Sequence, residues 1–430
     1  MSTHKRLLLG CISDDFTGAG DAASFLQDGG LKTLLVIWPH VERVSPESYD
    51  AVVVALKSRS IPPEDAIRES LAALDWLKTQ GAQKLYFKYC STFDSTPRGN
   101  IGPVCDAILE HYGIPCTVLC PSLLSNGRSV RGGTLFVNGV PLAESHMSRH
   151  PLNPMWSSSI KALMQAQSKY PCFEICADEY SDAGSLARNI KVISADNQHF
   201  YLVPEYYEPA HAEAILTLFG ELPFLTGGSG LLGSFAQNMS RLGAHASGRQ
   251  SSCCSAIAGN TGRLMLAGSC SDMTRRQVRR WIECGGRAVM VSAEDALTGA
   301  PRAAELADIF LSAPDRDILY YSSGSDGSAQ TDISDKAVSS AMESCLAAIA
   351  CAVLSKVPVT RLISAGGETS GAITTALGLG SFAIGNSIAP GVPVLIPNDK
   401  PELQLVLKSG NFGNERFFID VLKGDAGNES

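Results

Sequence analysis

The sequence predicts an α/β protein with two domains in series, each a mostly parallel sheet flanked by helices. The chain has 430 residues, which is too long for one ordinary hydrophobic core. Short apolar runs alternate with helical patterns, as they do in strand–helix–strand units. The alternation stops at a polar, small-residue stretch and then restarts. We therefore expect domains at 1–242 and 263–430, joined by a linker at 243–262.

The first domain begins with five predicted strands and three helices. The strands are apolar without clean alternation, as expected when both faces of a sheet are covered. The first helix has apolar residues at helical spacing from Ala19 and ends at Gly29 and Gly30. The second starts at Pro62 and Pro63. The predicted strands are 6–13, 31–38, 51–57, 84–91 and 116–122, and the later helices are 62–80 and 101–112.

The second domain repeats this alternation after the linker. A helix at 274–286 stops at glycine, and a long helix covers 332–356. The predicted strands are 264–269, 287–292, 317–323, 361–365 and 392–397. The same fold class is therefore expected in both halves.

Composition excludes several classes of protein. The net charge is −8, with 35 basic against 43 acidic residues and no basic tract, so nucleic acid is not an expected partner. No run of about 18 apolar residues is present, so no membrane span is predicted.

The 13 cysteines form no CxxC pair, and many lie in apolar runs. Reduced buried thiols favour a cytoplasmic protein.

The segment DDFTGAGD, residues 14–21, follows the first predicted strand. Open parallel sheets bind ligands beyond the carboxyl ends of their strands. One of Asp14 and Asp15 could simply cap the next helix. A cap explains one aspartate but not two, so we expect a functional carboxylate here.

Two further strand ends carry polar residues. Lys57 and Arg59 follow the third strand, where a cation could bind an acid, although a surface pair is the simpler interpretation. The loop 88–100, KYCSTFDSTPRGN, follows the fourth strand. Its hydroxyls, carboxylate and guanidinium suit a small polyhydroxylated acid. The alternative is a hydrogen-bonded turn before the next helix.

The second half contains glycine loops of the kind that bind phosphate. Three segments show the pattern of a strand, a small-residue loop and a helix, at 225–236, 266–274 and 363–377. A further glycine turn is the sequence KSGNFG at 408–413. Such loops present backbone N–H groups to phosphate oxygens, so together they indicate a nucleotide. No GxxxxGK[ST] motif is present, which excludes a P-loop enzyme.

These segments together resemble the four-carbon acid sugar kinases. The resemblance extends in order from residue 10 to about 415 and includes DDFTGAGD, SRS, STFDSTPRGN, CPSLLSNGRSVRGGTLFVNG, HPLNPM, TGGSG, AGSCS, GGETSGAI and KSGNFG. The STFDST and CPSLLSNGR segments look more like the 3-oxo-tetronate kinase branch than the D-threonate kinases. The chain departs from that branch at 18–20, where it has GAG rather than GAT or GSN.

The resemblance implies a sugar-acid site in the first domain, an ATP site in the second, and transfer of a phosphoryl group to the terminal hydroxyl of a four-carbon acid. Asp15 would orient or deprotonate that hydroxyl, with Mg²⁺ on the ATP phosphates and its protein ligands unassigned. Asp14 is one candidate for placing the metal. The substrate residues expected are Asp14, Arg59, Thr92, Phe93, Asp94, Ser95 and Arg98, with Arg59 or Arg98 holding the substrate carboxylate. The nucleotide residues expected are Ser269, Gly366, Gly367, Glu368, Thr369 and Gly410.

Two alternatives stay open at this point. In ribokinase-like enzymes GAGD forms an anion hole, and Asp21 would be the base. That motif lies late in ribokinase-like chains, however, so we expect Asp21 in the first turn of a helix, where a carboxylate is favourable. The other alternative is a non-catalytic sugar-acid-binding protein. The oligomeric state is open, and a homodimer is one option.

Overall fold

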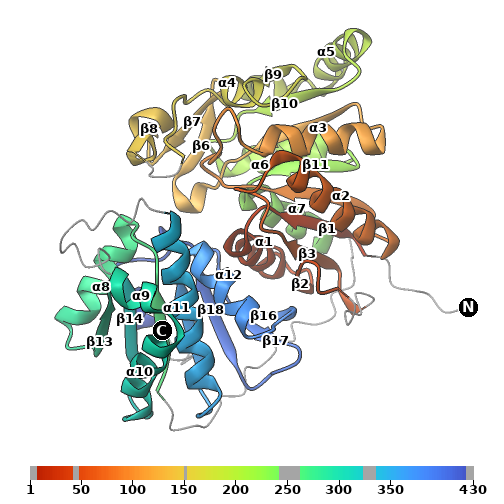
Figure 1. Ribbon diagram of the computed structural model, residues 1–430. Helices are drawn as coiled ribbons and strands as arrows, with labels where there is room; N and C mark the ends of the chain where they lie inside the picture. The colour runs from red at the N-terminus through yellow and green to blue at the C-terminus, as the bar shows by residue number, and fades with distance from the viewer. Residues whose placement is uncertain (1–6, 42–47, 150–152, 242–261, 323–335, 423–430) are drawn as a thin grey trace, which may run out of the picture. The chain divides into compact units, whose positions relative to one another are not determined.

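The structure, a computed structural model, describes residues 7–41, 48–149, 153–241, 262–322 and 336–422. The chain forms two compact units, Met1–Arg249 and Gln250–Ser430 (Figure 1). The linker predicted at 243–262 lies outside the described residues except for Gly262. Each unit is α/β with a mostly parallel sheet, which confirms the predicted fold class.

The sheet of the first unit is entirely parallel, in the order β2-β3-β1-β4-β11-β5-β10-β9. Its central strands are buried along their whole length, as their unbroken apolar runs predict. The strands are β1 Leu9–Ser13, β2 Thr33–Ile37, β3 Ala51–Ala55, β4 Lys84–Lys88, β5 Cys116–Cys120, β9 Cys172–Ile175, β10 Phe200–Pro204 and β11 Phe224–Gly227.

Helices cover both faces of this sheet. The chain moves one way across the sheet from β1 to β2 and the opposite way from β3 to β4. Right-handed crossovers then place α1 and α2 on opposite faces, where α1 packs against α7 and α2 against α3. The helices are α1 Phe16–Asp28, α2 Pro63–Thr79, α3 Ile101–Tyr112, α4 Ile160–Gln165, α5 Ala183–Asp196, α6 Pro209–Phe219 and α7 Ser229–Arg241.

A small antiparallel sheet, β6-β7-β8, was not predicted. It follows β5 and the 3-10 turn η2 Leu124–Asn126 (Figure 1, yellow). Its strands are β6 Arg128–Arg131, β7 Thr134–Val137 and β8 Val140–Pro141. These strands have two to four residues each, which is too short for an apolar pattern to identify.

The sheet of the second unit has the order β13-β14-β12-β15-β18-β17-β16. The first five strands are parallel, and β17 and β16 are antiparallel. The strands are β12 Leu264–Ala267, β13 Ala288–Val291, β14 Ile318–Ser322, β15 Arg361–Ala365, β16 Ser381–Ala389, β17 Val392–Pro397 and β18 Gln404–Lys408. The helices are α8 Asp272–Glu283, α9 Ala293–Thr298, α10 Ala300–Leu311, α11 Lys336–Leu354, α12 Gly367–Ala376 and α13 Phe417–Asp420.

Helix α11 is long and apolar enough to span a membrane by composition. Its window Ala337–Leu354 has a mean hydropathy of 1.8. Within its unit, however, α11 packs against α9, α10 and α12, and Leu346, Ile349 and Val353 are fully buried. These contacts make α11 part of the packing of its unit, so α11 gives no reason to revise the fold.

Candidate functional site

The end of β1 and the start of α1 are joined by Asp15. Asp15 is the N-cap of α1: its Oδ1 accepts a hydrogen bond from the Gly18 N–H at 2.8 Å, and its Oδ2 accepts one from Thr17 Oγ1 at 3.1 Å. A Cβ at Gly18 would lie 2.2 Å from Asp15 Oδ1. Glycine is therefore required for the carboxylate to reach the helix end.

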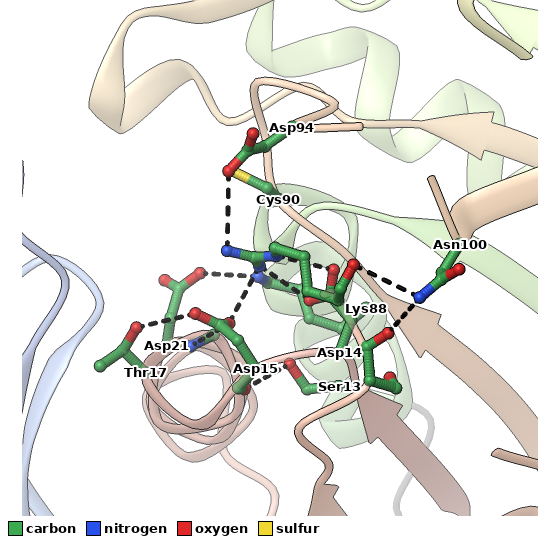
Figure 2. A network of polar contacts seen from close by, with 12 residues as sticks. Ser13, Asp14, Asp15, Thr17, Asp21, Lys88, Cys90, Asp94 and Asn100 are labelled. Carbon is green, nitrogen blue, oxygen red and sulfur yellow. Dashed lines mark hydrogen bonds and ion pairs between the residues drawn. The ribbon is translucent and has the colours of Figure 1, made fainter. Parts of the chain in front are cut away.

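Asp14 and Arg59 form a two-pronged ion pair between the ends of β1 and β3. Arg59 Nε donates to Asp14 Oδ2 at 3.0 Å, and Nη2 donates to Oδ1 at 2.8 Å. The same guanidinium lies 3.1 Å from Asp15 Oδ1 and 4.0 Å from Asp94 Oδ2. Figure 2 shows Asp14, Asp15 and Asp94 gathered at this edge of the sheet. Residues predicted from three separate loops are thus brought together.

The two neighbouring aspartates have different environments. The Asp14 side chain is 5% exposed and that of Asp15 is 22% exposed. Burial raises the pKa of the Asp14 carboxyl, although Arg59 opposes this. Burial also acts to raise the pKa of Asp15, but Arg59, Lys88 and the hydrogen bonds from Gly18 and Thr17 together hold it below its usual value. Asp15 is therefore an ionised carboxylate that a ligand can reach.

Behind Asp15 lies a buried pair, Lys88 and Asp21. Lys88 Nζ is 3.4 Å from Asp21 Oδ2, and the Ser229 hydroxyl donates to the same oxygen. Burial raises the pKa of Asp21 against the charge of Lys88. The expectation that Asp21 lies in the first turn of the helix is wrong, because the Asp15 cap starts α1 at Phe16. Asp21 consequently lies in the second turn and is buried.

The loop after β4 carries a buried aromatic residue, hydroxyl groups that form hydrogen bonds, and part of the lining of a small pocket. Phe93 is fully buried with φ of 48° and packs edge-on against Tyr89, so it anchors the loop. The Thr92 hydroxyl lies 3.0 Å from Cys90 Sγ, and Ser95 Oγ donates to Gln167 Oε1 at 3.0 Å. A small pocket beside this loop is lined by Asp14, Ser58, Arg59, Phe87, Asp94, Ser95, Asn100 and Ile101.

Arg98 is the predicted substrate residue that does not join this cluster. Its side chain is exposed, and the hydrogen bond of its backbone N–H goes to Thr96 Oγ1 at 3.3 Å. Asn100, which was not predicted, holds the segment that carries Arg59. Its Nδ2 donates to Ser58 O at 2.7 Å and to Ile61 O at 2.8 Å. A polar residue in a hydrophilic loop gives no sequence signal for that task.

In the second unit, the ends of β12, β15 and β18 form a close backbone cradle. These strands are neighbours in the sheet, and Ser269, Gly366 and Gly410 follow them. A Cβ at Gly410 would lie 2.3 Å from Ser269 Oγ, and one at Gly366 would lie 3.2 Å from Ser269 N. Gly366 also has φ of 126°, which favours glycine. The three loops therefore approach so closely that a side chain at Gly410 would collide with that of Ser269.

The remaining predicted nucleotide residues begin α12. Gly367 is its first residue, Glu368 is exposed in its first turn, and Thr369 is buried. The N–H groups of a first helical turn lack partners within the helix and suit an anion. The cradle and this helix end thus place the predicted nucleotide residues in one region of the second unit.

Lys408, which was not predicted, lies beneath the cradle. Its fully buried Nζ donates to Gly410 O at 2.9 Å, Ser409 O at 3.0 Å and Thr274 Oγ1 at 3.3 Å. Burial lowers the pKa of this ammonium to about 7. A lysine ending the apolar run LQLVL could have drawn attention to the position, because buried lysines are rare.

No group of three or more His, Cys, Asp or Glu side chains in the described parts of the chain could hold a metal ion. A magnesium ion that arrives with a nucleotide needs only one or two carboxylates beside the phosphates. Both Asp14 oxygens are engaged by Arg59, so Asp14 does not fit the metal role considered from the sequence.

Comparison with known proteins gives matches over nearly the whole chain. Residues 9–235 match a family model described as a sugar-binding N-terminal domain, and residues 264–418 match a nucleotide-binding C-terminal domain. A Cupriavidus necator protein named 3-oxo-tetronate kinase is 39% identical, with 97% of each chain covered. A Salmonella typhimurium protein of the same name is 40% identical, with 96% of this chain and 98% of the relative covered.

Solved structures match the fold over the same extent. A protein from Salmonella typhimurium LT2 has a TM-score of 0.81 at 37% identity, with 97% of this chain and 99% of that chain covered. A Haemophilus influenzae protein of the DUF1537 family has a TM-score of 0.71 at 35% identity, with 96% and 98% covered.

Proposed function

Because the chain belongs to the four-carbon acid sugar kinase family, we propose that it transfers the γ-phosphoryl group of ATP to the terminal hydroxyl of a four-carbon sugar acid, such as 3-oxo-tetronate. The family predicted from the sequence is the one that the comparisons show. The observation that carries the proposal is the solvent-reaching, ionised Asp15 at the end of β1, held by Arg59 and the start of α1. The cytoplasm is the proposed compartment.

Asp15 is suited to orienting the attacking hydroxyl. Its lowered pKa makes it a hydrogen-bond acceptor at neutral pH. Phosphoryl transfer passes through a loose transition state that requires positioning and charge stabilisation more than early removal of the proton. Arg59 fixes Asp14 and Asp15 together, so the acceptor oxygen of Asp15 is preorganised. The neighbouring loop, which follows β4, would supply further contacts to the substrate acid through Thr92, Asp94 and Ser95.

The second unit would hold ATP at the cradle formed by Ser269, Gly366 and Gly410. The N–H groups at the start of α12 would face the phosphates. The exposed carboxylate of Glu368 is an oxygen donor that could share Mg²⁺ with them. Bound there, Mg²⁺ would neutralise phosphate charge. Direct transfer requires the acid and ATP sites to meet in the reacting complex.

The ribokinase-like alternative has no support in the fold or the comparisons. Each unit has its own mostly parallel sheet, whereas one long domain with a small lid would support that alternative. Asp21 is also buried against Lys88 and Ser229, which is unsuited to a base that must reach a substrate. The alternative of a non-catalytic sugar-acid-binding protein is distinguished by the assay described next.

The test is ATP consumption with Mg²⁺ against 3-oxo-tetronate, D- and L-threonate, D- and L-erythronate, and ribose. We expect turnover with at least one four-carbon acid and its loss in Asp15→Asn. Binding of an acid without ATP binding or turnover would instead support a non-catalytic protein. Turnover with ribose alone would overturn the proposed substrate class.

A further inference from the structure

Arg128 lies on the opposite flank of the predicted acid site from Arg59. The strands run in the order β3-β1-β4-β11-β5. Arg59 follows β3, and Asp15 follows β1. Arg128 is the first residue of β6, which follows β5 and the short turn η2 in the chain. The two arginines thus stand at either side of the strand ends that carry the acidic cluster.

The backbone around Arg128 is closed into a tight loop. Arg128 N–H donates to Leu123 O at 3.0 Å, and Leu123 N–H donates to Arg128 O at 2.9 Å. Gly127 before it has φ of 72°, and a Cβ there would meet Asn138 Oδ1 at 1.9 Å. This loop fixes the position of the Arg128 backbone without help from its side chain.

The Arg128 guanidinium has no carboxylate partner among the described residues. Its Nη1 donates to Asn126 O, whereas its Nε is inaccessible to solvent and makes no hydrogen bond. Burial lowers the pKa of this group, and the charges of Cys90 and Asp21 oppose that effect. Cys90 lies in the loop after β4 that carries Asp94, and Asp21 lies in α1, the helix that Asp15 caps.

The other cations at this edge are already engaged or lie outside it. Arg59 donates with two nitrogens to Asp14, and diverting it would leave Asp14 buried without a counter-charge, which is strongly unfavourable. Lys88 is paired with Asp21. Arg98 is exposed on the loop rim. Among the described cations at this edge, Arg128 is therefore the one that a substrate carboxylate can meet without breaking an ion pair.

We infer that Arg128 binds the carboxylate group of the substrate acid. Guanidinium donors match a carboxylate in a two-pronged geometry. This places the acid between Arg128 at its carboxylate end and Asp15 at its terminal hydroxyl. The inference rests on the proposed function and adds the residue that selects an acid over a neutral sugar.

The test compares the acid that the wild-type protein phosphorylates with the tetritol in which a hydroxymethyl group replaces its carboxylate. Arg128→Gln should raise the KM for the acid about 10- to 100-fold, the effect of losing a charge-assisted pair. The KM for ATP should stay the same, and kcat/KM or the inhibition constant for the tetritol should change less than about threefold. Arg128→Lys, which keeps the charge, should recover part of the loss.

Arg131→Gln is the matched control on the same strand. Arg131 is exposed and lies over the Tyr207 ring, with its guanidinium carbon 5.0 Å from the centroid, so this variant should leave both ligands unaffected. An unchanged KM for the acid in Arg128→Gln would overturn the inference, as would equal losses on acid and tetritol. If the wild type phosphorylates no acid, the proposed function itself fails, which is a distinguishable result.

Discussion

Arg59 contacts both carboxylate oxygens of Asp14, at 3.0 and 2.8 Å, and so ties the end of β3 to the end of β1. The backbone reinforces this link, because the Ser58 and Arg59 N–H groups donate to Asp14 O. Asp14 is almost completely buried, whereas Asp15 beside it reaches solvent. The adjacent aspartates thus differ: Asp14 holds Arg59 from a buried position, whereas part of the Asp15 side chain stays exposed.

Removing Arg59 should destabilise the first unit. Arg59→Met leaves Asp14 buried without a counter-charge, which typically costs about 3–5 kcal/mol of unfolding free energy. Chemical denaturation measures the loss. The double variant Arg59→Met with Asp14→Leu should recover much of it, since no buried charge is left unpaired. Arg98→Met, at an exposed position, should change stability by less than about 0.5 kcal/mol. Equal stability of Arg59→Met and wild type would contradict this role.

Two substitutions of Asp15 separate its capping role from its proposed catalytic role. Asparagine caps helices as well as aspartate does, so Asp15→Asn should keep the melting temperature close to that of wild type. Its kcat should fall about 10²- to 10⁴-fold, because the neutral amide orients the attacking hydroxyl less strongly than a carboxylate does and cannot take up its proton. Asp15→Ala should lose the same activity and also about 1 kcal/mol of stability. Full activity in a folded Asp15→Asn protein would show that Asp15 acts only as a cap.

Two glycines of α1 should respond in opposite ways to alanine. A Cβ at Gly20 would meet nothing within 4 Å, whereas one at Gly18 would lie 2.2 Å from Asp15 Oδ1. Gly20→Ala should stabilise the helix by about 0.5–1 kcal/mol. Gly18→Ala should weaken the Asp15 cap and lower both stability and turnover. Thermal unfolding and initial rates check both variants, and destabilisation by Gly20→Ala would argue against the described packing of α1.

Lys408 should make the stability of the chain depend on pH. Its pKa is about 7 in the folded chain, against 10.5 without burial. Between these values the unfolded chain binds more protons, so the free energy of unfolding rises with pH. Below pH 7 the full cost of burying the charge is present. Lys408→Met should therefore gain most over wild type below pH 7, and the difference should shrink as pH rises towards 9. A difference that is independent of pH would contradict a buried, titrating ammonium.

The sequence predicted the sheet strands better than the contacts between them. Runs such as AVVVA at 51–55 identify buried strands directly, and the rule for strand ends selected Asp15 and the loop after β4. The pairing of Asp14 with Arg59 joins residues 45 positions apart, which only the strand order determines. The sequence offered Asp14 or Asp15 as the cap of α1, and because Asp15 is that cap the helix starts at Phe16, which moves Asp21 out of the first turn.

Arg128 and Lys408 show where residue patterns fail. An arginine after Asn126 and Gly127 looks like part of a surface turn, and its place becomes clear only when the short β6-β7-β8 sheet closes the loop around it. Lys408 ends an apolar strand, but its contacts come from Thr274 and Gly410, which lie in other loops. Both residues depend on non-local packing.

Proton-coupled phosphorus NMR of a reaction with ATP, Mg²⁺ and the preferred four-carbon acid tests the central claim most directly. Transfer to the terminal hydroxyl puts the phosphorus on a carbon with two protons, so we predict a new phosphomonoester triplet that grows in step with ADP. The signal should be absent with Asp15→Asn. A doublet would place the phosphoryl group on a secondary hydroxyl, and ADP formed with inorganic phosphate alone would contradict a sugar-acid kinase.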